Sequence, residues 1–271
     1  MNVPSSDSSR TPIEQYLSAV ESILQTVRAQ QEALETAADW FAQSILQGRL
    51  VHLFGAGHSR IMVEEMWPRY GSFPGFHPIV ELSLTFHTQV TGANGQRQAM
   101  FLENQAGLAE RILRNFQLSR DDSALVISSG GTNIVPIEMA EAFQATGMRV
   151  VTLVSQAHCL ASQSKREDGK KLIDFADLVL DSGAPVGDAM VDIPGLDTPV
   201  APGSTVGGCM VVNALKSAVA QRLTQAGSPP TVLTAANVVG AEKARHLFES
   251  AYDEHARRVT CLTRTIGRDD D

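Results

Sequence analysis

Apolar residues recur every three or four positions over residues 13–46, which predicts amphipathic helix at the start of the chain. The stripe weakens near Gln30, where a break into two helices would fall. Thr11 with Glu14 three positions later is typical of a capped helix start, and Gly48 indicates the end of the helical segment. We therefore expect one or two helices before the first strand.

Short apolar runs then alternate with glycine-rich turns and helical patterns. The runs show no polar alternation, as expected for strands buried on both faces of a parallel sheet. Strands that alternate with helices favour right-handed βαβ crossovers and an open, doubly wound sheet. The five expected strands are residues 50–54, 79–82, 124–127, 149–154 and 178–180.

After the last expected strand, the alternation of apolar runs and helical patterns stops. Residues 182–204 are rich in Gly, Pro and Asp, which predicts a loop that can hold a short hairpin. No internal repeat is present. The expected organisation is a disordered leader at 1–12, one domain at 13–258 that includes helices at 205–223 and 240–258, and a flexible tail at 259–271.

The first candidate for chemistry is the run Gly-Ala-Gly-His-Ser at residues 55–59, between a strand and a helix. Glycines there let the backbone turn sharply and approach a ligand, while free N–H groups at a helix start attract an anion. Ser59 adds a hydroxyl. Position 60 is Arg60, so the third glycine of the dinucleotide fingerprint is missing. The alternative interpretation is a tight turn with no ligand.

The second candidate is the run Ser-Ser-Gly-Gly-Thr-Asn at residues 128–133, again between a strand and a helix. Its hydroxyls and N–H groups can bind a phosphate without a metal. The Lys-Ser/Thr pair of a P-loop is absent, which argues against a nucleoside triphosphatase. Because ligands of doubly wound sheets bind beyond the carboxyl ends of the strands, we expect both loops to converge on one pocket for a dianion.

The composition of the chain argues against several classes of partner and cofactor. The 271 residues carry a net charge of −8 without a cluster of Lys and Arg, which argues against nucleic acid as the main partner. No apolar run is long enough to cross a membrane, and the N-terminus lacks an export signal. Cys159, Cys209 and Cys261 lie far apart, which predicts reduced thiols in the cytoplasm. The histidines show no zinc spacing, so we expect no metal and no cofactor.

The loops and their order resemble the SIS (sugar isomerase) domain family, and most of all its UPF0309 branch. The resemblance spans roughly residues 13–258. Single loops are weakly specific, whereas the set in this order is strongly specific. The matching segments are residues 54–59, 64–66, 127–133, 136–140, 202–205, 213–214 and 236–238.

The resemblance implies a site that binds the phosphate of a sugar. The family's second loop reads roughly Ser-x-Ser-Gly-x-Ser/Thr, and two registers are open. If Gly131 is the family's glycine, Ser128 is the first serine and Asn133 replaces the last hydroxyl. If Gly130 is that glycine, Ser129 is the second serine. The candidate binding residues are Gly57, Ser59, Ser128, Ser129, Gly131, Thr132, Asn133 and Ser204.

Proton transfer between C1 and C2 of a phosphorylated sugar needs one general base, and a carboxylate or an imidazole can serve. The candidate catalytic residues are Glu65, Glu64, His58 and His87. Glu64 and Glu65 point about 100° apart on a helix, so only one can face the ligand, and we favour Glu65. A solvated helix face is the alternative for this pair. His58 lies in the first loop, and His87 in a stretch with the alternation of an edge strand.

We expect a three-layer αβα sandwich with a flavodoxin-like sheet of five parallel strands and an N-terminal helical extension. The resemblance implies a homodimer or homotetramer with sites at subunit borders. The expected function is aldose–ketose isomerisation of a phosphorylated sugar. A phosphosugar lyase, an amino-sugar deaminase of the same fold and a non-catalytic phosphosugar sensor are the alternatives.

Overall fold

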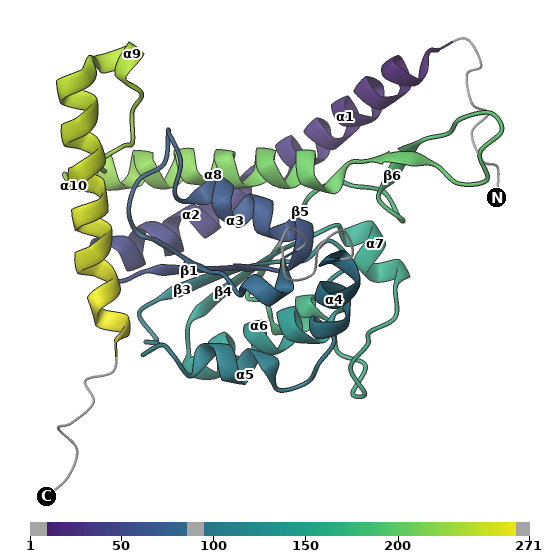
Figure 1. Cartoon of the computed structure of the whole chain (residues 1–271), viewed down its shortest axis with the longest axis horizontal. Helices are drawn as coiled ribbons and strands as arrows, with labels where there is room; N and C mark the ends of the chain where they lie inside the picture. Colours follow the sequence, from purple (N-terminus) through teal and green to yellow (C-terminus); the bar gives the residue numbers. More distant parts are fainter. Residues whose placement is uncertain (1–9, 86–94, 264–271) are drawn as a thin grey trace, which may run out of the picture.

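The computed structural model describes residues 10–85 and 95–263, and its centre is an open sheet of five parallel strands with helices on both faces (Figure 1). The strand order is β2-β1-β3-β4-β5, the flavodoxin-like doubly wound order. The predicted three-layer α/β fold is therefore confirmed. The strands are β1 (Val51–Gly55), β2 (Phe76–Ile79), β3 (Ser123–Ile127), β4 (Arg149–Val154) and β5 (Leu178–Asp181).

Four of the five strands lie within a residue or so of their predicted bounds, whereas the prediction for the second strand was wrong. It was expected at residues 79–82, but β2 occupies Phe76–Ile79 and includes Pro78. A proline can be tolerated there because β2 is the edge strand of the sheet. The apolar residues Val80 and Leu82, which suggested the strand, are 40% and 65% exposed.

One face of the sheet is covered by four helices that share an apolar cluster with it (Figure 1). The predicted break near Gln30 is confirmed, since Gln30 joins the first two helices. Its side-chain amide donates to the carbonyl oxygen of Asp181 at 2.6 Å and accepts from the N–H of Asp181 at 2.8 Å. The break thus docks the N-terminal extension onto β5. The helices are α1 (Pro12–Ala29), α2 (Gln31–Leu46), α3 (Arg60–Met66) and α8 (Ser204–Gln225).

The opposite face holds a second apolar cluster, centred on α6. Helix α6 ends before Gly147, whose φ of +89° is left-handed, as the sequence indicated. Three short helices here had no clear apolar period and were not predicted. The helices of this face are α4 (Gly95–Leu102), α5 (Leu108–Leu113), α6 (Ile134–Thr146) and α7 (Gln156–Ala161).

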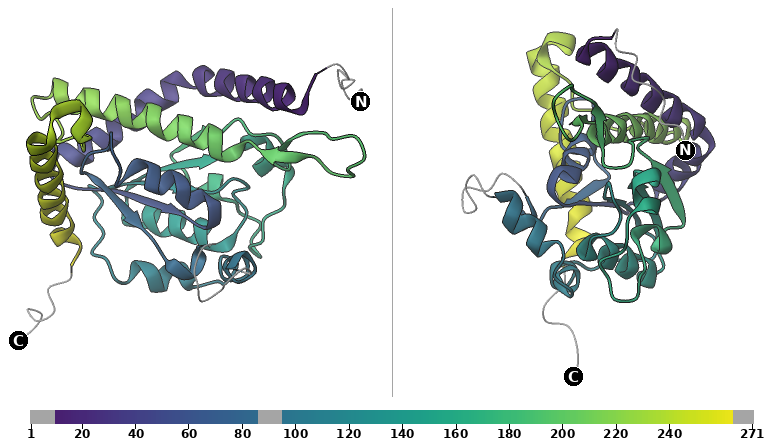
Figure 2. Two further views of the ribbon diagram at one scale, coloured as in Figure 1. Left: turned by 45° about the horizontal axis from the view of Figure 1, so that its top comes forward. Right: turned by 90° about the vertical axis from the view of Figure 1, so that its right-hand side faces the viewer.

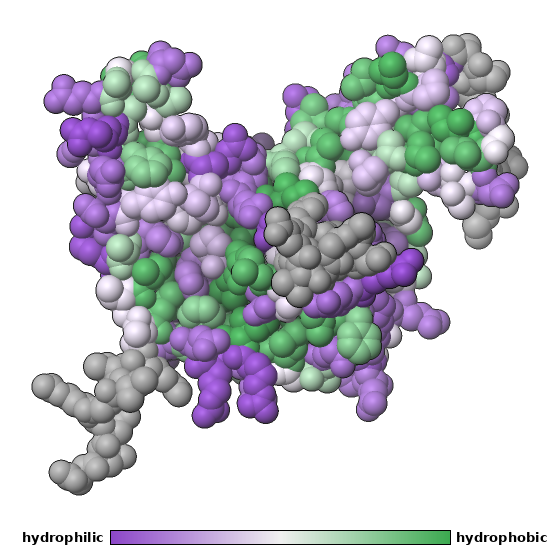
Figure 3. All heavy atoms as spheres, viewed as in Figure 1, coloured by the Kyte–Doolittle hydropathy of each residue, from purple (hydrophilic) through white to green (hydrophobic). Residues whose placement is uncertain are grey.

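Two segments extend beyond the sheet (Figures 1 and 2). The expected short hairpin is present as β6 (Ala189–Val191) and β7 (Val200–Pro202), and with α1 it forms an arm at one end of the molecule. Apolar surface is visible on this arm (Figure 3). At the other end, the short helix α9 (Ala236–Val239) leads into α10 (Ala241–Val259). Most of the predicted leader and tail lies outside the described residues.

Candidate functional site

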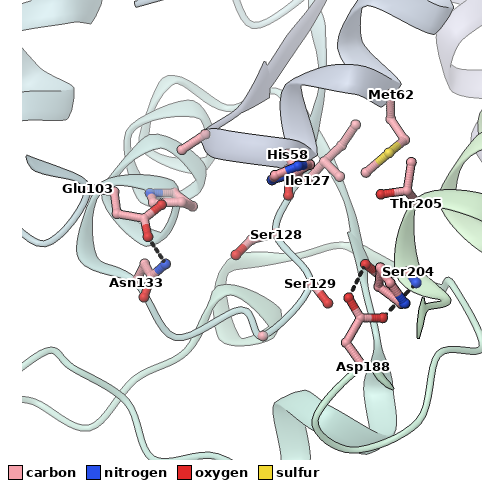
Figure 4. A pocket seen from close by; sticks show the side chains of 15 residues that line it. His58, Met62, Glu103, Ile127, Ser128, Ser129, Asn133, Asp188, Ser204 and Thr205 are labelled. Carbon is pink, nitrogen blue, oxygen red and sulfur yellow. Dashed lines mark hydrogen bonds between the residues drawn. The ribbon is translucent and has the colours of Figure 1, made fainter. Parts of the chain in front are cut away.

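A cavity of about 320 Å³ lies at the carboxyl ends of β1 and β3 (Figure 4). Gly55 and Ile127 are paired at the ends of these strands, so the two following loops begin side by side. The strand order reverses here, and ligands of doubly wound sheets bind at such points. We call it the switch-point cavity. Its lining is Ala56, His58, Ser59, Met62, Glu103, Ile127, Ser128, Ser129, Gly130, Asn133, Pro136, Asp188, Pro202, Ser204 and Thr205.

The first loop turns sharply because two glycines allow it. A Cβ atom on Gly55 would lie 2.7 Å from the backbone oxygen of Ser59, and Gly57 has a left-handed φ of +56°. The chain therefore passes directly through the 3₁₀ turn η1 (Gly57–Ser59) into α3. His58 and Ser59 line the switch-point cavity, whereas Gly57 does not.

The second loop contributes Ser128, Ser129, Gly130 and Asn133 to the switch-point cavity. Ser128 is buried, and its hydroxyl oxygen accepts a hydrogen bond of 3.3 Å from the N–H of Gly131. Within the described part of the chain, the backbone N–H groups of Ser129 and Gly130 have no acceptor, so both can donate to an anion. Either register considered for this loop places a serine hydroxyl at the cavity.

Gly131 and Thr132, two further predicted binding residues, lie behind this lining. Gly131 has a φ of +60°, and a Cβ atom on it would lie 2.9 Å from the sulfur of Cys159. The carbonyl oxygens of Gly131 and Thr132 accept hydrogen bonds from the N–H groups of Leu172 (2.8 Å) and Lys165 (3.1 Å). In this structure the two residues therefore hold the loop in place.

The third wall of the cavity comes from the start of α8. Asp188 has a φ of +68°, which is uncommon for a residue other than glycine. Its carboxylate accepts hydrogen bonds from the N–H and the hydroxyl of Ser204, both at 2.7 Å, and from the N–H of Gly203 at 3.1 Å (Figure 4). Asp188 therefore caps the positive end of a long helix. Ser204, one of the predicted binding residues, lines the cavity, with its hydroxyl proton directed at Asp188.

Glu103, directly after α4, places a buried carboxyl group in the wall opposite Asp188 (Figure 4). It is 7% exposed, and its Oε1 accepts a hydrogen bond of 2.7 Å from the side-chain amide of Asn133. The Asn133 oxygen accepts in turn from Nζ of Lys165 at 2.5 Å. Burial raises the pKa of Glu103 to about 7, against a smaller opposing effect of the Lys165 charge.

The predicted acid–base pair Glu64 and Glu65 lies in a different cavity, of about 740 Å³, between α3 and α10. The Glu65 carboxylate accepts a hydrogen bond of 2.8 Å from the Asn213 amide and pairs with Arg69. Burial would raise the pKa of Glu65, but the hydrogen bonds from Asn213 and Arg69 outweigh it and lower the pKa. Glu64 pairs with Arg60 at 3.4 Å. Neither carboxylate lines the switch-point cavity of its own chain.

The remaining predictions concern His87, metals and membranes. His87 lies outside the described residues. Over residues 10–85 and 95–263, no group of three or more His, Cys, Asp or Glu side chains could hold a metal ion. In the same part of the chain, no helix has both the length and the apolar character needed to span a membrane.

Three polar residues of the cavity were not among the sequence candidates: Glu103, Asp188 and Thr205. Thr205 sits beside Ser204 in a segment that matched the family, so a signal for it existed. Glu103 precedes its partner Asn133 by 30 residues, and Asp188 precedes Ser204 by 16. Neither pair has a local sequence signature, because packing alone brings the partners together.

Comparison with known proteins gives matches over most of the chain. The model of the SIS domain matches residues 15–155. A UPF0309 protein of Halalkalibacterium halodurans is 30% identical over 243 residues, which cover 89% of this chain and 95% of the relative. A second UPF0309 protein of this organism is 32% identical over 213 residues, covering 79% and 86%. Among solved structures, a phosphoheptose isomerase from Neisseria gonorrhoeae matches with a TM-score of 0.49 and 13% identity, covering 76% and 95%.

Proposed function

Because the chain belongs to the SIS domain family, we propose that it binds a phosphorylated sugar in the switch-point cavity. The observation that carries this proposal is the convergence of both loops on one cavity, with Ser59 from the first and Ser128 and Ser129 from the second. A phosphate dianion needs several hydrogen-bond donors. Three hydroxyls, with the N–H groups of Ser129 and Gly130, supply them.

The charges of the cavity orient the ligand. Glu103 lies on one wall and Asp188 on the opposite wall, whereas the serines of the second loop lie between them (Figure 4). Repulsion from a carboxylate disfavours a phosphate close to it, so the phosphate lies against the serine loop. The carbonyl and hydroxyl groups of the sugar then extend toward residues that accept or exchange protons.

The reaction we propose is aldose–ketose isomerisation. It moves one proton between C1 and C2 of the open-chain sugar, so the site needs a group that takes a proton and returns it. Of the acid–base residues predicted from the sequence, His58 is the one that lines the switch-point cavity within the described residues. His58 is therefore placed to exchange protons with a bound sugar.

Glu65 can take part only through a second copy of the chain, as in the predicted homodimer or homotetramer. Its cavity is open and includes the exposed apolar side chains Ile61, Tyr70 and Phe248. Apolar surface next to charged groups is typical of subunit interfaces. In this proposal a neighbouring subunit packs over the cavity, and Glu65 serves the switch-point cavity of that neighbour.

The proposal is tested by binding and turnover of ribose 5-phosphate, glucose 6-phosphate and fructose 6-phosphate. We expect Ser128→Ala to weaken binding of the best ligand by about tenfold or more, because a hydrogen bond to a charged group contributes on the order of 1.5–3 kcal/mol. Ser217→Ala, an exposed serine on α8, is the matched control and should bind like the wild type. Binding without turnover would favour a phosphosugar sensor. Unchanged affinity in Ser128→Ala would contradict the phosphate site.

A further inference from the structure

We infer that Glu103 is the general base of the proposed isomerisation, the group that takes the proton from C2 of the bound sugar and returns it to C1. This inference rests on the proposed function. It concerns a residue that no sequence motif singled out. Glu103 lines the switch-point cavity, and its side chain faces the same space as the serines that are proposed to hold the phosphate (Figure 4).

Three hydrogen bonds hold Glu103 in place. Its N–H donates to the carbonyl oxygen of Ala99 in α4, and its carbonyl oxygen accepts from the N–H of Val135 in the first turn of α6, both at 2.9 Å. The Oε1 atom accepts from the Asn133 amide at 2.7 Å. The position of this carboxyl group is thus set both by α4 and by the helix that follows the second loop.

The orientation of the Asn133 amide is determined by its other partner. Because Nζ of Lys165 can only donate, the atom it contacts must be the Asn133 oxygen, so the Asn133 nitrogen faces Glu103. Asn133 therefore acts as a donor toward one oxygen of Glu103. The second oxygen, Oε2, has no hydrogen-bond partner in the described part of the chain and is available to a ligand.

The environment of the Glu103 carboxyl group also suits a general base. Burial raises the pKa of Glu103 to about 7, so the carboxyl group can both take and return a proton near neutral pH. The other titratable groups lining the cavity are His58 and Asp188, and Lys165 lies behind Asn133. Glu81 precedes the turn that packs against α4, and its carboxylate accepts hydrogen bonds from the N–H and the hydroxyl of Ser83.

The proton transfer is balanced within the site. The Glu103 carboxylate takes the proton from C2, the electrons of that C–H bond form the C1=C2 double bond, and O1 takes a proton from the His58 ring. The resulting enediol then loses the proton of O2 to His58 while the C2=O bond forms. The electrons of the C1=C2 bond take the proton back from Glu103 at C1. Both residues return to their starting states.

The test measures turnover and exchange of the C2 proton with deuterated solvent, for the same three sugar phosphates, in wild type and Glu103→Gln. We expect Glu103→Gln to lose about 100-fold or more in both rates while the dissociation constant changes by less than about threefold. Glu110→Gln makes the same chemical change at an exposed position in α5 and should keep the wild-type rates. A proton exchange rate in Glu103→Gln close to that of the wild type would overturn the inference.

Two further outcomes separate this inference from the proposed function. The turnover rate of the wild type should fall as pH drops below about 7, and this readout does not depend on the folding of a variant. A rate that stays constant down to pH 5 would exclude Glu103 as the base. Exchange by no substrate would overturn the role of Glu103 together with isomerisation. Weakened binding in Ser128→Ala would then still support a phosphosugar site.

Discussion

Arg49 and Asp122 form a bidentate ion pair before the amino ends of β1 and β3, at the end of these strands opposite the switch-point cavity, with N–O distances of 2.9 and 2.8 Å. The Asp122 carboxylate also accepts hydrogen bonds from the N–H groups of Leu50 and Ser119, at 3.2 and 2.9 Å. Burial would raise the pKa of Asp122, but the nearby His52 ring, whose Nε2 lies 3.3 Å from Oδ2, and the hydrogen bonds from Arg49 outweigh it and lower the pKa to about 2. This network ties the start of β1 to the start of β3.

We expect Asp122→Asn to lower the free energy of unfolding by about 3 kcal/mol, because it leaves Arg49 without its charged partner. Asp121→Asn, the exposed neighbour, should change it by less than about 0.5 kcal/mol. In the wild type, the stabilisation by Asp122 is complete above its ordinary pKa near 4 and is lost as pH falls toward 2. Urea unfolding at pH 7 and pH 3 measures both effects, and equal losses in the two variants would contradict the role of the pair.

Gly207 lets α8 touch the chain beyond β5. A Cβ atom on Gly207 would lie 1.9 Å from the carbonyl oxygen of Ser182, which cannot move without shifting the backbone. A Cβ atom on Gly208 would meet only the flexible Met62 side chain, at 3.0 Å. We expect Gly207→Ala to cost about 2 kcal/mol or more and Gly208→Ala less than about 1 kcal/mol. Thermal unfolding of the two variants checks the difference, and the reverse order would show that α8 packs differently.

Glu103 should make stability fall as pH rises. Its pKa is about 7 in the folded chain, above its ordinary value of 4.5, so the folded state holds a proton that the unfolded state has lost. The resulting destabilisation is absent below pH 4.5, grows between pH 4.5 and 7, and is complete above pH 7. We expect Glu103→Gln to remove it and to be more stable than the wild type at pH 8 by up to about 3 kcal/mol. Urea unfolding at pH 5 and pH 8 measures this, and parallel curves for the two proteins would exclude the shift.

Mixing of variants tests whether Glu65 serves a neighbouring subunit. Glu65→Gln should lower turnover, as should Ser128→Ala, because each removes a different part of the proposed shared site. In a symmetric dimer, equal amounts of both variants restore about a quarter of the sites, since mixed dimers contain one intact site each. The two proteins are unfolded, refolded together and assayed. Turnover no higher than the average of the separate variants would show that Glu65 does not complete a neighbour's cavity.

Local patterns were enough to predict four of the five strands and the two loops that follow β1 and β3. Four strands were placed within a residue or so because each is a mostly apolar run that is followed within two residues by glycine or serine. The break at Gln30 was also visible, since it interrupts a regular apolar stripe. The edge strand β2 was misplaced because its four residues include His77 and Pro78, which carry no strand signal.

The residues of the candidate site likewise fall into those that local patterns predict and those that only tertiary packing places. Ser59, Ser128 and Ser129 could be predicted because the turns that carry them depend on neighbouring residues and follow strands of one sheet. Glu103 could not be predicted, since its place depends on how α4 packs near the start of α6. Glu65 was favoured over its neighbour Glu64, but α3 presents both to the cavity shared with α10.

The amino-acid sequence by itself therefore determined four of the five strands, the long helices and the two strand-to-helix loops, because these follow from short-range backbone preferences and apolar periodicity. Only the tertiary structure decided which acidic groups share the space with those loops. A contact such as that between Glu103 and Asn133 forms across 30 residues. It is set by the packing of whole helices against the sheet, which no local pattern records.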